Sequence, residues 1–437
     1  MIEQLFIHRF RGICSGQIGK LKRINLFVGP NNSGKTSILE LLYLAGTSGR
    51  AATFVRDDLM PAVTGSLRAT TSIRTDLLGY APLPRLRLRH GKRSDWSGNP
   101  AVVTAEGGLE VNLARLALGK IAPPWETFRL SAPLVAWGSE DRDLFTQDDL
   151  PQLALFTLPC PEALEPGMVP TIVAEAGVTP DTVHWHYLWE PAWVYHRAPQ
   201  SPLDHLAVWA TLGTPPASKR VVFFDAHVAN DHLNEEFVHQ AYLTIPNWYE
   251  QITKHMVKVF PTLKGAKIEI ADAPDGQQGQ TGYIRFPGQR PLAVDNLGDG
   301  ARHAFKLFAA LTALAATVDP EHQGMLLWEE PESGQNPATL ARLLTEVVRI
   351  VRNRPIQLFF TSHSLEVIAQ FTHMLQRRVL AAADTLMFRM KLDVDTGLLK
   401  TSWFDDANLT AWLASGLDPR ILEDFDAPLQ FHLREDV

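Results

Sequence analysis

Residues 29–36 have the composition of a loop that holds phosphate. Their sequence, GPNNSGKT, fits the pattern G-x-x-x-x-G-K-[ST] at every fixed position. Glycines allow a tight loop whose backbone N–H groups converge on phosphate oxygens, and a helix that begins there adds the positive end of its dipole. The motif therefore predicts a nucleoside triphosphate site, and it does not choose between ATP and GTP.

Two side chains at the end of this loop could act on the triphosphate. Lys35 can reach the β- and γ-phosphates, and the Thr36 hydroxyl can ligate Mg²⁺. A nucleotide bound with Mg²⁺ is therefore the expected ligand. The residues expected to contact it are Gly29, Asn31, Asn32, Ser33, Gly34, Lys35, Thr36 and Ser37.

A second group of reactive residues lies at positions 325–330, MLLWEE, where an apolar run ends in two acids. A triphosphate site needs a carboxylate for the Mg²⁺ shell and a group that orients the attacking water. Acids at the carboxyl end of a parallel strand lie where ligands bind in α/β sheets. We expect Glu329 to bind Mg²⁺ together with Thr36, and Glu330 to polarise the water. The alternative is a solvated acidic turn.

A third apolar run, residues 358–364 with the sequence LFFTSHS, passes into polar residues in the same way. His363 could hydrogen-bond the γ-phosphate or the attacking water. A histidine at the end of a strand is weak support by itself, so a catalytic role for His363 depends on the other motifs around it.

The elements that must position these residues alternate between strand and helix. Residues 24–28, INLFV, have the length of a buried strand, and residues 36–44 have the apolar spacing of a largely buried helix. Residues 221–224 predict another strand, and the segments 268–270 and 282–286 predict a hairpin. The sequence therefore predicts an α/β protein.

Length and composition limit the class of protein. The chain has 437 residues, of which 45% are hydrophobic and 20% charged, as in ordinary globular proteins. Two cysteines cannot build a disulfide framework or a four-cysteine zinc site, which favours a reducing, cytoplasmic environment. The N-terminus lacks the pattern of a secretory signal, and no apolar stretch reaches the roughly 20 residues of a membrane span. We therefore expect an intracellular protein without a membrane partner.

Charge is distributed unevenly along the chain. The net charge is −7, but residues 1–100 carry 15 Lys and Arg against 6 Asp and Glu, and the remainder carries 26 against 42. The first quarter is therefore +9 and the rest −16. Within this basic quarter, residues 85–89 alternate as RLRLR. A strand there would place Arg85, Arg87 and Arg89 on one face, which is either solvated or in contact with phosphates of a nucleic acid.

Residues 120–217 differ in composition from the rest. They hold 14 of the 30 prolines and 6 of the 11 tryptophans, and prolines interrupt long helices. This composition argues against a long coiled coil and favours a compact, loop-rich insertion whose tryptophans form a core rather than stack on bases. His184, His186 and His196 have no cysteine or glutamate motif beside them, so structural roles are favoured over a metal site.

Taken in order, the motifs resemble the ABC-type ATPase heads of the SMC, RecF and OLD group. FRG at 10–12 and GPNNSGKTS at 29–37 resemble the group's N-terminal Walker A region. NLGDGAR at 296–302 resembles its signature motif, LLWEEPE at 326–332 its Walker B, and TSHS at 361–364 its switch histidine region. The resemblance implies an α/β P-loop NTPase with an ABC-type head, built on a mixed sheet with flanking helices and carrying an inserted α+β subdomain.

In that group two heads pack head to tail, and ATP with Mg²⁺ lies between the Walker A loop of one subunit and the signature of the other. The resemblance implies that Gly298, Asp299 and Gly300 meet the γ-phosphate bound to a partner subunit. It also implies a homodimer or a higher homo-oligomer. The residues it implies to be catalytic are Lys35, Glu330 and His363.

The chain departs from the group's pattern at several positions. Gly298 replaces the usual signature serine, so one hydroxyl donor is missing. Asp299 places a carboxylate near phosphate, or it acts as the N-cap of the following helix. Glu329 stands where Asp is common, which lengthens its reach to the metal by one methylene. Residues 335–337, QNP, replace the usual Leu-His-Pro after Walker B.

The expected organisation is an N-terminal lobe at 1–119, a Pro- and Trp-rich insertion at 120–220 and a C-terminal lobe at 221–437. By resemblance the protein is an ATP-gated switch in anti-phage defence that acts with a separate effector protein. Residues 364–437 are too few for the nuclease domain that some relatives carry. The alternatives are a DNA-binding repair head similar to RecF, and a scaffold that is stabilised by ATP and does not hydrolyse it.

Overall fold

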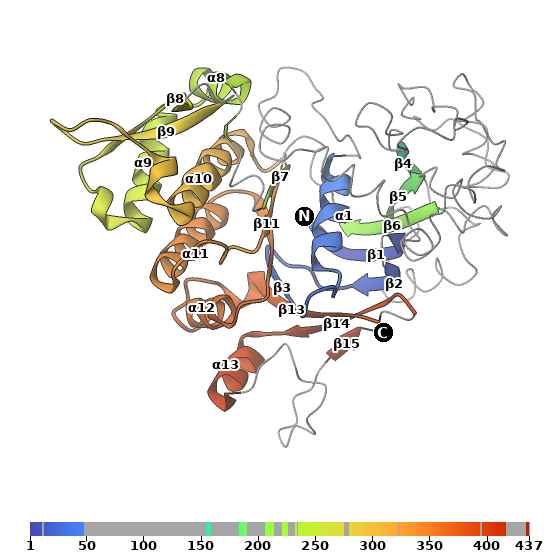
Figure 1. Ribbon diagram of the computed structural model, residues 1–437. Helices are drawn as coiled ribbons and strands as arrows, with labels where there is room; N and C mark the ends of the chain where they lie inside the picture. The colour runs from blue at the N-terminus through green and yellow to red at the C-terminus, as the bar shows by residue number, and fades with distance from the viewer. Residues whose placement is uncertain are drawn as a thin grey trace, which may run out of the picture.

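The protein is built around a large mixed β-sheet with helices on both faces (Figure 1). Arg11, the arginines of residues 85–89 and His196 lie outside the part of the chain that the structure describes. In the computed structural model the described residues are 1–10, 13–47, 154–158, 183–189, 206–213, 221–225, 232–233, 235–274, 279–321, 323–393, 396–416 and 434–436.

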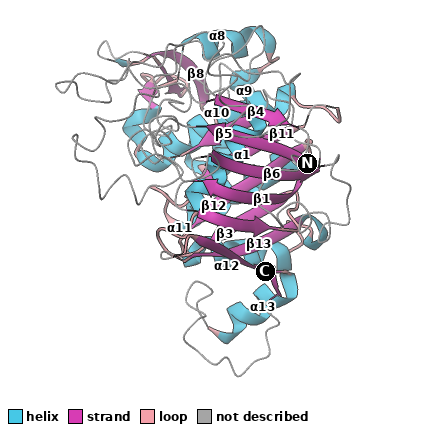
Figure 2. Ribbon diagram, turned by 90° about the vertical axis from the view of Figure 1, so that its right-hand side faces the viewer, coloured by secondary structure: helices cyan, strands magenta, loops and turns pink. Residues whose placement is uncertain are grey.

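Among these residues the large sheet has twelve strands, in the order β4-β5-β6-β1-β2-β14-β13-β3-β12-β11-β7, with β15 paired to β14. Figure 2 shows many of them side by side. Their bounds are β1 Ile2–Phe10, β2 Ile13–Ile18, β3 Ile24–Val28, β4 Ala154–Leu158, β5 Val183–Trp189, β6 Leu206–Gly213, β7 Val221–Phe224, β11 Gly324–Glu329, β12 Ile356–Ser362, β13 Thr385–Leu392, β14 Leu398–Phe404 and β15 Arg434–Asp436.

Five neighbouring strands in this sheet, β13, β3, β12, β11 and β7, run parallel. The strands predicted at residues 24–28 and 221–224 are β3 and β7, and every residue of both is buried. Continuous apolar sequence is typical of parallel strands that are covered on both faces. Because the carboxyl ends of parallel strands share one edge, the segments after β3, β11 and β12 meet there. The structure confirms the expected fold class.

Helices cover the two faces of the parallel strands unequally (Figure 1). Alternate residues of β3 point to opposite faces, so that Leu26 packs with the larger helical layer and Phe27 with α1. The larger layer contains α10, α11 and α12. The bounds of the helices are α1 Lys35–Thr47, α8 Glu235–Thr244, α9 Trp248–Val259, α10 Asp299–Thr317, α11 Pro337–Arg352, α12 Leu365–Gln376 and α13 Asp406–Ser415.

A second sheet precedes α10 and contains β8 Lys267–Asp272, β9 Gln280–Arg285 and β10 Leu292–Ala293. β8 and β9 pair antiparallel, which confirms the predicted hairpin. Gly282 lies against α10, because a Cβ on it would come within 2.7 Å of the Phe305 ring. This close packing links the small sheet to the helix that begins at the predicted signature.

Three described strands belong to the predicted insertion at 120–220. β4 pairs with β5, β5 with β6, and β6 with β1, so these strands extend the large sheet. The other residues of the insertion lie outside the described part of the chain, and so do the side chains of its tryptophans and histidines. The domain boundaries at 119–120 and 220–221 stay predictions.

Candidate functional site

The glycine loop joins β3 to α1 in a shape that small residues allow. A Cβ on Gly29 would lie 2.5 Å from the backbone oxygen of Met390. Gly34 has φ +91°, in the left-handed region that favours glycine. Asn32 has φ +64°, which asparagine tolerates better than most residues. Helix α1 begins at Lys35, so a helix N-terminus stands behind the loop, as a phosphate site requires.

The remaining residues predicted to contact nucleotide lie on this loop or in the first turn of α1. Asn31 and Asn32 are exposed, Ser33 is buried and Ser37 is partly buried. The structure therefore keeps them in one short segment at the sheet edge. Their contacts with a nucleotide stay predictions.

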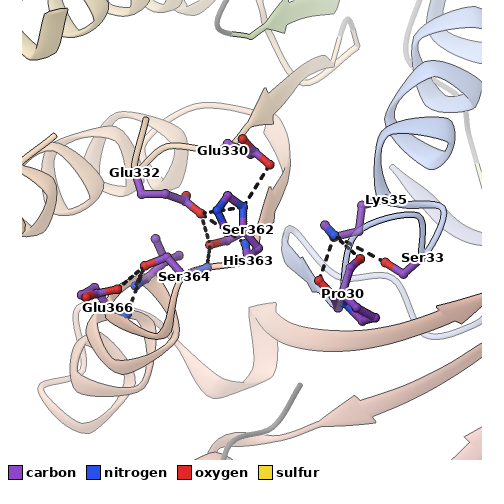
Figure 3. A network of polar contacts seen from close by, with 11 residues as sticks. Pro30, Ser33, Lys35, Glu330, Glu332, Ser362, His363, Ser364 and Glu366 are labelled. Carbon is purple, nitrogen blue, oxygen red and sulfur yellow. Dashed lines mark hydrogen bonds and ion pairs between the residues drawn. The ribbon is translucent and has the colours of Figure 1, made fainter. Parts of the chain in front are cut away.

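Lys35 is buried beside the loop and bound by the loop's own oxygens (Figure 3). Its Nζ donates to the carbonyl oxygen of Gly29 at 2.9 Å and to that of Pro30 at 2.8 Å. Burial lowers the pKa of Lys35 from its ordinary value. Nearby carboxylates favour the charged form and oppose this shift. In order of decreasing effect on the pKa of Lys35 they are Glu330, Glu329 and Glu332.

Thr36 and Glu329, the two residues predicted to bind Mg²⁺, touch each other directly. The Thr36 hydroxyl donates a hydrogen bond to Glu329 Oε1, across 293 residues of chain. The alternation of β11 explains the contact, because Trp328 packs in the α10 layer and the next side chain turns to the α1 face. Carboxylate and hydroxyl oxygens are ligands that Mg²⁺ accepts.

The protein alone supplies few ligands for a metal at this point. Among the described residues, no group of three or more His, Cys, Asp or Glu is placed to hold an ion. Mg²⁺ commonly keeps several waters and binds through one or two protein oxygens together with substrate phosphates. Thr36 and Glu329 therefore fit an Mg²⁺ that arrives with a nucleotide, and not a permanent metal centre.

Glu330 and His363, predicted to be catalytic, are paired at the same edge (Figure 3). The Glu330 N–H donates to the carbonyl of Thr361 at 3.1 Å, which holds the ends of β11 and β12 together. Glu330 has φ +46°, a strained conformation for a residue with a side chain, and such residues concentrate at functional sites. Its Oε1 lies 3.0 Å from His363 Nδ1.

Two further acids at this edge are not among the predicted site residues. Glu332 accepts a hydrogen bond from the Ser362 hydroxyl at 2.7 Å. Asp225 directly follows β7 and is 3% exposed, and it is level with Glu329 because Phe224 pairs with Trp328. The signal for Asp225 in the sequence was the one that identified Glu329, an acid directly after a buried strand. The signal for Glu332 was the third acid in EEPE, directly after the proline.

The predicted signature residues Gly298, Asp299 and Gly300 lie at the start of α10. Gly298 has φ +95° and is the N-cap, without a side-chain capping bond. The expectation that Asp299 caps the helix is wrong, because Asp299 is already the first helical residue. Its carboxylate accepts instead from Arg302, one turn along. Asp299 is 74% exposed, so it is accessible to another molecule.

The turn that follows Glu329 and Glu330 also contacts the predicted signature of the same chain. A Cβ on Gly300 would lie 2.8 Å from the carbonyl oxygen of Gly334, and Gln335 Nε2 donates to the Gly300 carbonyl at 3.0 Å. Asn336 caps α11 by accepting from the Thr339 N–H at 2.9 Å. The residues that replace the usual Leu-His-Pro therefore hold the start of α11 against the start of α10.

The fold and these contacts together define a class of protein. A strand, glycine loop and helix lie beside an acidic strand end and a polar strand end, at one edge of a mostly parallel sheet. That arrangement is the one expected of a P-loop NTPase with an ABC-type head.

The comparisons with known proteins point to the same class. A family model described as "AAA domain, putative AbiEii toxin, Type IV TA system" matches residues 217–369, about a third of the chain. That range includes the signature, Glu329, Glu330 and His363. A DNA replication and repair protein RecF from Psychromonas ingrahamii is 47% identical over 45 residues, which is 10% of this chain and 12% of that protein. These two matches show a likeness of parts of the chain to an AAA domain and to RecF.

Solved structures of SMC heads show a remote likeness. The SMC head domain from Thermotoga maritima has a TM-score of 0.36 and 11% identity, and covers 92% of this chain and 98% of its own. The Smc head from Pyrococcus furiosus, bound to the C-terminal domain of ScpA, has a TM-score of 0.42 and 9% identity, and covers 95% and 98%. Within the described residues, every helix is too short or too polar to cross a membrane.

Proposed function

We propose that this protein hydrolyses ATP and uses the hydrolysis to switch between two assembly states. The observation that carries the proposal is the meeting of Thr36 with Glu329, and of Glu330 with His363, at the edge beside the Lys35 loop. Thr36 and Glu329 can bind the Mg²⁺ of a nucleotide, and Glu330 and His363 can orient the attacking water. Glu329, Glu330 and His363 lie at the carboxyl ends of adjacent parallel strands, where α/β proteins bind ligands.

Each residue has a distinct part in this chemistry. The loop N–H groups and Lys35 bind the phosphates, and Lys35 must exchange its carbonyl partners for phosphate oxygens. Mg²⁺ held by Thr36 and Glu329 would neutralise charge that develops on the β- and γ-phosphates. Glu330 accepts a proton from the attacking water, and His363 holds Glu330 and the water in place. ATP is the proposed nucleotide because the motifs resemble those of ABC-type ATPase heads.

Two copies are proposed to close on the nucleotide. Gly298, Asp299 and Gly300 of one copy would meet the γ-phosphate held by the other, as an exposed helix N-terminus can do. ATP would then join the copies, and its hydrolysis would release them. The assembly is a homodimer or a higher homo-oligomer of such pairs.

Glu330→Gln tests the switch. The substitution keeps the size of the side chain and removes the general base, so turnover should fall about 10²- to 10³-fold while ATP still binds. Light scattering after size-exclusion chromatography should show a larger mass with ATP than without it. The control is the same variant with ADP, which should keep the smaller mass. An unchanged mass in ATP contradicts the proposed switch.

The biological role we propose is cytoplasmic defence against phage, in which the ATPase controls a separate effector protein. The resemblance of the motifs to the SMC, RecF and OLD group supports it, and the description of the matched family model names a putative toxin. Purification from the native cells with and without ATP, followed by identification of the copurifying proteins, tests it. An ATP-dependent protein partner is expected.

A DNA-binding role is the second candidate, and the RecF match favours it. The basic residues Arg85, Arg87 and Arg89 are the proposed contact, although they lie outside the described residues. Binding to DNA should weaken steeply as salt rises. If affinity is unchanged when all three become alanine, that segment is not the site.

A further inference from the structure

Glu332 lies in the turn after β11 and contacts the residues at the end of β12 (Figure 3). It follows Glu330 by two residues, and its side chain is 14% exposed. Its Oε1 accepts from the Ser362 hydroxyl at 2.7 Å and from the His363 N–H at 3.2 Å. The same oxygen lies 3.6 Å from His363 Nδ1. One carboxylate oxygen therefore contacts both the backbone and the ring side of His363.

His363 needs such contacts because packing covers only about half of its side chain. Its side chain is 51% exposed, so hydrogen bonds rather than neighbouring apolar groups must fix the orientation of the imidazole. Glu330 Oε1 at 3.0 Å and Glu332 Oε1 at 3.6 Å both face Nδ1. Because both are acceptors, the ring proton belongs on Nδ1, and Nε2 is turned away from the carboxylates.

The contact extends beyond His363 to the helix that follows. The Ser362 hydroxyl, which donates to Glu332, accepts from the Ser364 N–H at 2.9 Å. Ser364 is the N-cap of α12 and accepts from the N–H groups of Glu366 and Val367. Glu332 thus ties the turn after β11 to the start of α12 through groups that surround His363.

We propose that Glu332 is a positioning residue that fixes the tautomer and orientation of His363 for hydrolysis. The proposal rests on the ATPase function proposed above. Glu332 Oε2 is buried and has no hydrogen-bond partner. A buried carboxylate oxygen without a partner calls for an explanation. The contacts of the other oxygen, Oε1, with the backbone and ring of His363 supply one.

Kinetics of four variants test the proposal. Glu332→Ala should lower kcat about 10- to 100-fold, because a misplaced catalytic group loses its geometry, and should leave KM for ATP unchanged. Glu332→Gln should recover most of the activity, since its amide oxygen can accept the same two hydrogen bonds. In a His363→Ala background, Glu332→Ala should cause no further loss. Glu366→Ala, the matched control, removes an acid that accepts from the Ser364 hydroxyl at 2.5 Å and should keep wild-type turnover.

A measurement without turnover separates this proposal from the ATPase function. In protein labelled with ¹⁵N-histidine, the His363 ring, assigned through His363→Ala, should show the Nδ1–H tautomer in the wild type and a tautomer mixture in Glu332→Ala. Wild-type protein without ATP turnover would contradict the ATPase function, and the ring spectrum would still decide the role of Glu332. An unchanged ring spectrum, losses that add in the double variant, or an equal loss in Glu366→Ala would overturn the proposal.

Discussion

Two clusters of charged side chains in this protein are built in opposite ways. Glu346 on α11 is 3% exposed and is surrounded by partners from α9 and from its own helix. His255 Nδ1 lies 2.8 Å from it, and Lys258 and Arg349 form ion pairs with it. Glu332 at the sheet edge has two donors on one oxygen and none on the other.

The charge balance differs in the same sense. Glu346 has two cations and a histidine for one carboxylate, whereas the three carboxylates of Glu329, Glu330 and Glu332 have one ammonium, that of Lys35, and one histidine, His363, beside them. Among these residues the edge therefore has more carboxylates than cations, and Glu330 is in a strained backbone conformation. In a structural cluster the charged groups find their partners within the protein. A functional one keeps strain and unmatched charge that a bound metal and substrate can relieve.

The largest effect should come from Lys35→Ala. Removal of the only cation in the phosphate loop should lower ATP turnover about 10³-fold or more, because the charge that develops on the phosphates loses its partner. Phosphate release measures it, and Lys254→Ala, on the exposed face of α9, is the control. If the wild type shows measurable turnover and Lys35→Ala abolishes it, the alternative of a scaffold that does not hydrolyse ATP is excluded. Turnover that survives the change would contradict the assignment of the site.

Glu346→Ala should have the converse effect. It removes the acceptor of the His255 and Lys258 hydrogen bonds, and Lys258 and Arg349 stay solvated, so the free energy of unfolding should fall by about 2 kcal/mol. The variant that does fold should turn over ATP at close to the wild-type rate. Urea unfolding followed by circular dichroism measures the stability, and Glu250→Ala, an exposed acid on α9, should change it little. If the stability holds and turnover falls instead, the contrast between the clusters is wrong.

The smallest effect concerns pH. Burial alone would raise the pKa of Glu346, but hydrogen bonds from His255 and Lys258 and the charges of Lys258 and Arg349 lower it from 4.5 to about 2. A carboxyl whose pKa is lower in the folded state stabilises the fold above its unfolded pKa, and this stabilisation is lost as pH falls towards 2. The difference in unfolding free energy between wild type and Glu346→Gln should therefore shrink between pH 5 and pH 2. A difference that is constant with pH would contradict the ion-pair account.

Local sequence predicted much of the fold because its signals are carried within single elements. The strands β3 and β7, the β8–β9 hairpin and the glycine loop all follow from apolar runs, turn residues and spacing. Glu330 and His363 were each predicted near the attacking water, but their direct contact appeared only in the structure. The N-cap of α10 did not follow from the sequence, since glycine and aspartate are both good N-cap residues, and only the backbone showed Gly298 in that role.

The sequence by itself determined the class of chemistry, because a phosphate loop and an acidic strand end are short patterns whose residues act where they stand. Only the tertiary structure decided which acids meet which partners. The contact of Thr36 with Glu329 spans 293 residues, and that of Glu332 with Ser362 spans 30. Such contacts depend on how strands are ordered and which face of the sheet each side chain takes, and these are properties of the packed sheet rather than of any segment in it.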